Sequence, residues 1–111
     1  MWLLAAHSSH AQTRHAKHED FHDKLVQLGA GPEGGSFGPI GNTLCDTINQ
    51  ERVNTLVRCV AIRSAGSVFN IYAVANGSIQ LGFGQEDLVA EAFLKKDTRG
   101  GTALRTVALM H

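Results

Sequence analysis

The stretch of sequence that decides the fold reads Leu25-Val26-Gln27-Leu28-Gly29-Ala30-Gly31-Pro32-Glu33-Gly34-Gly35-Ser36-Phe37-Gly38-Pro39. Its first four residues are typical of a short strand. The glycines that follow are not tolerated inside a helix or a strand, so they predict a loop. Pro39 suits the first turn of a helix, where a missing N–H is not needed. The stretch therefore predicts a strand, a glycine-rich loop and a helix in succession.

Downstream of this stretch, helical and strand patterns alternate. Apolar residues at helical spacing predict helices over residues 39–52, 68–75 and 86–94. Runs rich in β-branched and apolar residues predict strands over 56–62, 79–83 and 104–109, and Asn76-Gly77 predicts a left-handed end to the second helix. The order β-α-β-α-β-α-β predicts an α/β fold, with a mostly parallel sheet covered by helices on both faces.

The first 24 residues have a different composition. Met1–Ala6 is apolar, and residues 12–24 are polar and rich in histidine. We expect residues 1–24 to be a disordered tail or the remnant of a signal peptide cleaved near Ala11. His15, His18 and His22 would share one helix face, with His10 nearby, but no cysteine is close, and we expect no metal site.

Charge and length exclude several classes of function. The chain has 111 residues with ten basic and ten acidic side chains, and no dense basic stretch suggests a nucleic-acid partner. No apolar run approaches the roughly 20 residues that a membrane-spanning helix needs. The two cysteines, Cys45 and Cys59, could be free thiols, half of a metal site or a disulfide, and their number does not decide between these.

The predicted sheet brings three loops together, because ligands of open α/β sheets bind beyond the carboxyl ends of the strands. These loops are Gly31–Gly38, Ser64–Ser67 and Gly84–Glu86. The first two lead into helix N-termini, whose free N–H groups and dipoles attract anions. Ser36, Ser64, Ser67 and Gln85 add neutral donors, although either of Ser64 and Ser67 alone would equally suit a helix cap. The set predicts a binder of a carboxylate-bearing small molecule, with no catalytic residues and no cofactor.

The alternative is an NAD(P)-binding domain of an oxidoreductase. Gly29-x-Gly31-x-x-Gly34 follows a strand and precedes a helix, as in the dinucleotide-binding fingerprint. The predicted helix begins several residues too late for Gly34 to pack it on the strand. After the second strand, Arg63 stands where an acidic residue would bind a ribose hydroxyl, although an arginine would suit a 2′-phosphate.

Six segments, in order along residues 25–111, resemble the TAXI family of solute receptors of TRAP transporters. They are Gly34-Gly35-Ser36-Phe37-Gly38-Pro39-Ile40-Gly41, Cys45-Asp46-Thr47-Ile48-Asn49, Arg58-Cys59, Ser64-Ala65-Gly66-Ser67-Val68-Phe69-Asn70, Gly82-Phe83-Gly84-Gln85-Glu86-Asp87 and Leu104-Arg105-Thr106-Val107-x-x-Met110-His111. The family has the periplasmic-binding-protein fold, in which two α/β lobes joined by a hinge close on a ligand. The resemblance implies that residues 25–111 are an incomplete solute-binding α/β lobe, the first of the two.

The resemblance also implies a function. The protein would be the extracytoplasmic solute-binding component of a TRAP-type importer, located in the periplasm, and not an enzyme. Its partners would be a small anionic solute (an amino acid or a dicarboxylate) and the importer's membrane permease subunits. A Cys45–Cys59 disulfide could persist in the periplasm. The ligand-binding residues would be Gly35, Ser36, Phe37, Ser64, Gly66, Ser67, Val68 and Gln85.

Departures from the family pattern limit this expectation. Glu86 replaces a serine, and its carboxylate would repel an anionic ligand. A lone lobe lacks half of the cleft, so we expect weak or no ligand binding by this chain. A truncated product that folds poorly and exposes apolar surface is the third hypothesis, beside the solute receptor and the nucleotide-binding domain.

Overall fold

The computed structural model describes residues 1–6, 23–95 and 104–109 of the chain. The strands are β1 (Trp2–Ala6), β2 (Lys24–Gly29), β3 (Val57–Ile62), β4 (Leu81–Gly84) and β5 (Leu104–Leu109). The helices are α1 (Phe37–Gln50), α2 (Arg52–Thr55), α3 (Ser67–Ala75) and α4 (Glu86–Lys95). From β2 onward, strands and helices alternate as the sequence predicts, except that the short α2 was not expected.

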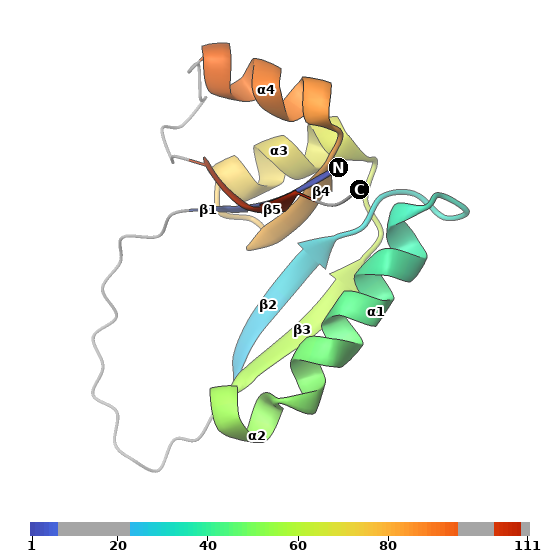
Figure 1. Ribbon diagram of the computed structural model, residues 1–111, viewed down its shortest axis with the longest axis vertical. Coiled ribbons are helices and arrows are strands. Elements are labelled where there is room, and N and C mark those ends of the chain that lie inside the picture. The colour runs from blue at the N-terminus through green and yellow to red at the C-terminus, as the bar shows by residue number, and fades with distance from the viewer. Residues whose placement is uncertain (7–22, 96–103, 110–111) are drawn as a thin grey trace.

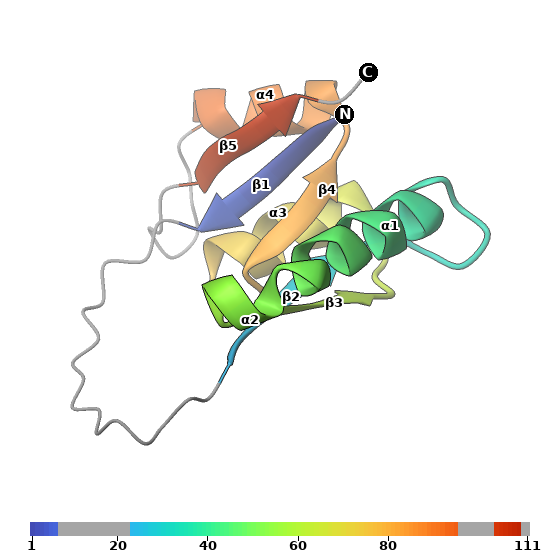
Figure 2. The ribbon, with the colours of Figure 1, turned by 60° about the horizontal axis from the view of Figure 1, so that its bottom comes forward.

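The strands form one mixed sheet in the order β3-β2-β4-β1-β5. β2 pairs in parallel with both β3 and β4, whereas β1 runs antiparallel to β4 and to β5. Figure 2 shows β5, β1 and β4 side by side in that order. Four of the strands therefore point the same way, and the predicted α/β fold with a mostly parallel sheet is confirmed.

Helices cover both faces of the sheet (Figure 1). Leu3 packs in one core cluster with residues of α1, and Leu4 packs in another with Ile71 of α3 and Val89 of α4. Successive side chains of a strand point to opposite faces. Because Leu3 and Leu4 are consecutive, α1 covers one face of the sheet and α3 and α4 cover the other.

The expectation of a tail over residues 1–24 is wrong for residues 2–6, which form β1 inside the sheet. Leu4 is fully buried and Leu3 nearly so. The local pattern of an apolar run of this length does not distinguish a tail from a buried strand, and in the structure the run lies between β4 and β5 as a strand. Residues 7–22, which include His10, His15, His18 and His22, lie outside the described residues.

Element boundaries differ from the predicted ones by about two residues. α1 begins at Phe37, not Pro39, so Pro39 still lies in the first turn. Gly77 is left-handed with φ of 83°, as the Asn76-Gly77 pair predicted. The amide of Ile79 then donates to the carbonyl of Ala73 at the end of α3 (3.2 Å), which delays the start of β4 to Leu81. Ile79 is buried beside Ala73 and Val74 instead of extending the strand.

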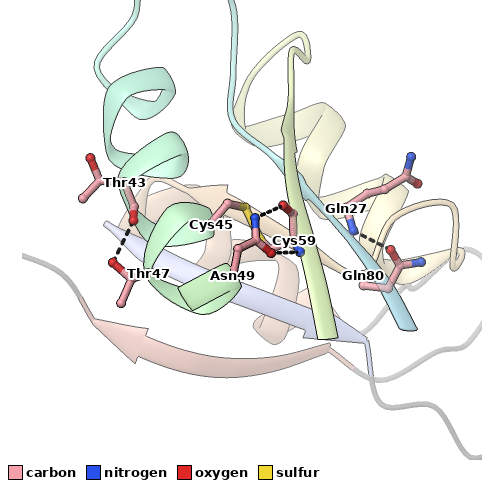
Figure 3. The surroundings of a disulfide bond; sticks show 7 residues. All are labelled: Gln27, Thr43, Cys45, Thr47, Asn49, Cys59 and Gln80. Atoms are coloured by element: carbon pink, nitrogen blue, oxygen red, sulfur yellow. Dashed lines mark hydrogen bonds between the residues drawn. A yellow bond between two sulfur atoms is a disulfide. The ribbon is translucent and has the colours of Figure 1, made fainter. Parts of the chain in front are cut away.

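Two contacts at Cys59 fasten α1 to β3 (Figure 3). Cys45 and Cys59 form a disulfide with their Cα atoms 4.9 Å apart, which confirms the pairing that the resemblance implied. The side-chain amide of Asn49 donates to the carbonyl of Cys59 (2.9 Å) and accepts from its N–H (2.7 Å). β3 is an edge strand, so Asn49 gives its outer backbone groups the partners that a further strand would supply.

Candidate ligand-binding site

Two of the loops at the carboxyl end of the sheet are joined by a reciprocal pair of hydrogen bonds. The N–H of Gly31, in the glycine loop (residues 30–36), donates to Oγ of Ser64 at 2.9 Å. The N–H of Ser64, in the second loop (residues 63–66), donates to the carbonyl of Gly31 at 3.0 Å. The pair fixes the relative positions of the segments that lead into α1 and α3.

A third hydrogen bond joins the start of α3 to the residue that links β4 to α4. Oγ of Ser67 accepts the N–H of Gln85 at 3.0 Å. Ser67 is itself buried. Glu86, the next residue, begins α4, so this bond places the start of α4 beside the start of α3.

Asn70 of α3 holds the ends of two strands. Its side chain is fully buried, and Nδ2 donates to the carbonyl of Gly29 (3.0 Å) and to that of Phe83 (2.9 Å). A Cβ atom on Gly29 would lie 2.3 Å from Oδ1 of Asn70, and one on Gly82 would lie 2.9 Å from Cβ of Asn70. The glycines are required here because the helix side chain rests directly on the strand backbone.

These contacts shape an open cleft of about 600 Å³. Its lining is Met1, Pro32, Gly35, Ser36, Phe37, Ala65, Gly66, Ser67, Val68, Gln85, Glu86 and Leu88. Seven of the eight predicted ligand-binding residues are in this lining, drawn from all three loops. The exception is Ser64, whose hydroxyl accepts the amides of Gly31 and Gly66 and so holds the loops together.

Five lining residues were not in the predicted set. Met1 was missed because β1 was expected to be a tail. Ala65 lies between the predicted residues Ser64 and Gly66, and Pro32 lies three residues before Gly35. The loop sequence gave no reason to select either of them. Leu88 and Glu86 lie in the first turn of α4, and the sequence had marked Glu86 only as a carboxylate unsuited to an anionic ligand.

Two helices begin at the cleft with no side-chain cap and no acidic residue in the first turn. α1 starts after Ser36 and α3 after Gly66, and neither cap residue makes a side-chain hydrogen bond to its helix. Neither helix has an acidic residue in its first turn, whereas α4 has Glu86 and Asp87 there. The starts of α1 and α3 therefore present N–H groups and the positive dipole end to a ligand in the cleft.

The aromatic wall of the cleft is anchored in the core. The ring of Phe37 stacks on that of Phe83, with centroids 5.3 Å apart and planes inclined by 28°. Phe83 is fully buried, whereas Phe37 is partly exposed in the lining. Phe37 thus offers a fixed apolar surface beside the start of α1.

The glycine loop departs from the dinucleotide-binding geometry. Gly34 lies in the loop with φ of 83°, ahead of α1, so it does not pack the helix on the strand. Gly41, within α1, has that role, because a Cβ atom at this position would lie 3.1 Å from Cβ of Ala30 and 3.3 Å from the ring of Phe83. Arg63 is paired with Glu33 at 3.2 Å on the exposed rim of a neighbouring cavity of about 340 Å³.

Within residues 1–6, 23–95 and 104–109, no group of three or more His, Cys, Asp and Glu side chains is arranged to hold a metal ion. No helix in that part of the chain has both the length and the apolar character needed to cross a bilayer.

Comparison with known proteins places the chain in a family. No curated protein and no solved structure is detectably similar to the chain. The model of the NMT1-like family, a family of the periplasmic binding-protein type, matches residues 28–111. The matched region runs from the last residues of β2 through β5 and includes every loop of the cleft. Because the match extends over more than half of its sequence, the chain belongs to the NMT1-like family.

Proposed function

We propose that this chain is the first lobe of an extracytoplasmic solute receptor of a TRAP-type importer, and that it binds a small carboxylate-bearing solute. The observation that carries the proposal is the cleft of about 600 Å³ onto which α1 and α3 open with uncapped N-termini. Backbone N–H groups at helix starts are a common way to hold a carboxylate. Ser36, Ser67 and Gln85 add polar groups around the same space.

Membership of a binding-protein family supports a receptor and not an enzyme. The described lining contains serine hydroxyls but no histidine, lysine or cysteine to activate one of them. The TAXI type and the permease partner rest on the motif resemblance. A periplasmic location agrees with the Cys45–Cys59 disulfide, because such bonds persist in oxidising compartments.

The proposal is tested by following backbone amide resonances while propionate or glutarate is added. We expect shifts concentrated at the starts of α1 and α3, with a dissociation constant on the order of 1 mM or weaker, because a single lobe leaves the ligand half exposed. Propionamide, which has no negative charge, should shift these amides much less.

The matched variants are Ser36→Asp and Ser36→Asn. Both residues are good helix caps, so both variants should fold. The Asp side chain adds a negative charge at the lining, so it should weaken carboxylate binding at least about tenfold relative to Asn. If neither carboxylate perturbs the cleft amides at about 50 mM, which is roughly fifty times a dissociation constant of about 1 mM, the proposal is wrong. Perturbation by NADP instead would favour the nucleotide-binding alternative.

A further inference from the structure

Glu86 is the ionisable side chain of the cleft. It is exposed, it begins α4, and it is the one charged side chain among the described lining residues. Its carboxylate makes no hydrogen bond or ion pair within the described part of the chain. The hydrogen bond between Gln85 and Ser67 fixes its position, because it holds the residue before Glu86 against the start of α3.

The cleft is consequently polarised. The starts of α1 and α3 present N-terminal N–H groups with no acidic residue in the first turn. The start of α4, which lies beside the start of α3, presents a carboxylate. A ligand with only negative charge would be attracted by the N–H groups and repelled by the carboxylate. A ligand with a carboxylate at one end and a cation at the other would be attracted by both.

A carboxylate at the position of Glu86 also has a purely structural role at the start of α4, separate from any contact with a ligand. A carboxylate in the first turn of a helix is stabilised by the helix dipole, and that alone would account for an acidic residue here. Asp87 provides the same charge in the same turn of α4, but it is not in the cleft lining. The two residues therefore share the helix role, and they differ in their access to the ligand.

We propose that Glu86 is a specificity-determining residue that selects a zwitterionic, amino-acid-type solute over a simple mono- or dicarboxylate. The solute's ammonium group would lie at the Glu86 carboxylate, and its carboxylate would lie at the starts of α1 and α3. This inference rests on the proposed function of the cleft. Of the two solute classes that were expected, amino acids and dicarboxylates, it selects amino acids.

The test compares ligands that differ only by an ammonium group. L-Alanine is propionate with an added ammonium group, and L-glutamate is glutarate with the same addition. Dissociation constants for all four are obtained by amide-resonance titration of the 111-residue chain. We expect each amino acid to bind about two- to fivefold more tightly than its deaminated partner, the upper part of the range for a solvent-exposed ion pair. The preference should diminish as salt is raised.

The matched variants are Glu86→Gln and Asp87→Asn, each of which removes one carboxylate from the first turn of α4. The preference for amino acids should disappear in Glu86→Gln, and propionate and glutarate should bind that variant more tightly than they bind the wild type. Asp87→Asn should retain the wild-type preference. A thermal melt of each variant checks that both have lost the same helix-stabilising charge and remain folded.

The possible results separate this inference from the proposed function. If propionate and glutarate bind the wild type at least as well as the amino acids, the assignment of Glu86 is overturned while the carboxylate site stands. An equal loss of preference in Asp87→Asn would also overturn it. The preference would then come from the total negative charge at the start of α4 and not from Glu86 itself. If none of the four ligands perturbs the cleft, the proposed function itself fails.

Discussion

At the scale of single residues, Asn70 is the side chain on which the cleft depends most. It does not line the cleft, yet its amide holds the carbonyls at the ends of β2 and β4, from which two of the three loops start. Its Oδ1 has no hydrogen-bond partner among the described residues and lies against the backbone of Gly29. The donor half of the amide therefore makes both of these bonds.

Replacing Asn70 by Asp keeps the size of the side chain and removes these donors. We expect a loss of about 3–5 kcal/mol at neutral pH, because an unpaired carboxylate would be buried against two carbonyl oxygens. Burial raises the pKa of the new carboxyl group above its value of about 4 in the unfolded chain. The folded state then binds the proton more tightly, so the deficit should grow as the pH rises above about 4 and shrink below it.

Urea unfolding of Asn70→Asp and wild type between pH 3 and pH 8 measures this deficit. Asn76→Asp provides the control, because Asn76 is exposed at the end of α3. A deficit that does not depend on pH would mean that the carboxyl group is solvated and that Asn70 does not hold the strand ends as described.

At the scale of elements, α1 and β3 are fastened by a covalent bond as well as by packing. The disulfide closes a segment with a sequence separation of 14. Asn49, one turn after Cys45 in α1, adds its two hydrogen bonds to the same residue of β3. The first loop therefore leads into a helix that is fixed at its middle, and this limits how far its N-terminus can move relative to the cleft.

Removing the crosslink with the pair Cys45→Ala and Cys59→Ala should lower the free energy of unfolding by about 3 kcal/mol, the loop-closure value for a segment of this length. Denaturant unfolding of the wild type with and without reductant should give a similar difference. Reductant should leave the double variant unchanged. Equal stability of the oxidised and reduced wild type would show that the crosslink contributes nothing.

The sequence was sufficient to predict elements whose local pattern agrees with their surroundings. β5 was predicted at residues 104–109 and α4 to within a residue, because a run of apolar and β-branched residues and an acidic first turn are local signals. β1 could not be predicted, since six apolar residues before a polar segment have no partner until β4 and β5 are placed. In the cleft, Ser36, Ser67 and Gln85 followed from loop position and four further lining residues from the family resemblance, whereas the structural role of Ser64 required knowledge of where Gly31 lies.

At the scale of the whole molecule, β1 is the strand that makes the sheet continuous. β4 and β5 do not pair with each other, and each pairs with β1 along its length. Leu3 and Leu4 also contribute to the cores on the two faces. Without β1, β5 would have no described strand partner, and Met1 would leave the cleft lining.

Replacing Leu4 by Asp should therefore release β5 from the sheet. Leu4 is fully buried, and a carboxylate there would cost at least about 3 kcal/mol from the lost packing and the burial of charge. Hydrogen exchange should show loss of amide protection in β5 and at the β1 side of β4, while β2 and β3 retain theirs. Leu94→Asp, at an α4 position where the side chain is 82% exposed, should change little. Unchanged protection in β5 would contradict the bridging role.

The position of β1 also has a consequence for how the protein reaches its folded state. Trp2 pairs with Leu109, so the contact that completes the sheet joins residues near opposite ends of these 111 residues. During synthesis, the apolar β1 segment emerges before β2 and β3, and its two partner strands, β4 and β5, emerge after them. It must remain unpaired while α1, β3 and α3 assemble, and closing so long a segment is slow. A sheet built in this order folds through a stage in which an apolar strand and its empty slot are both exposed, and this is the stage most vulnerable to aggregation.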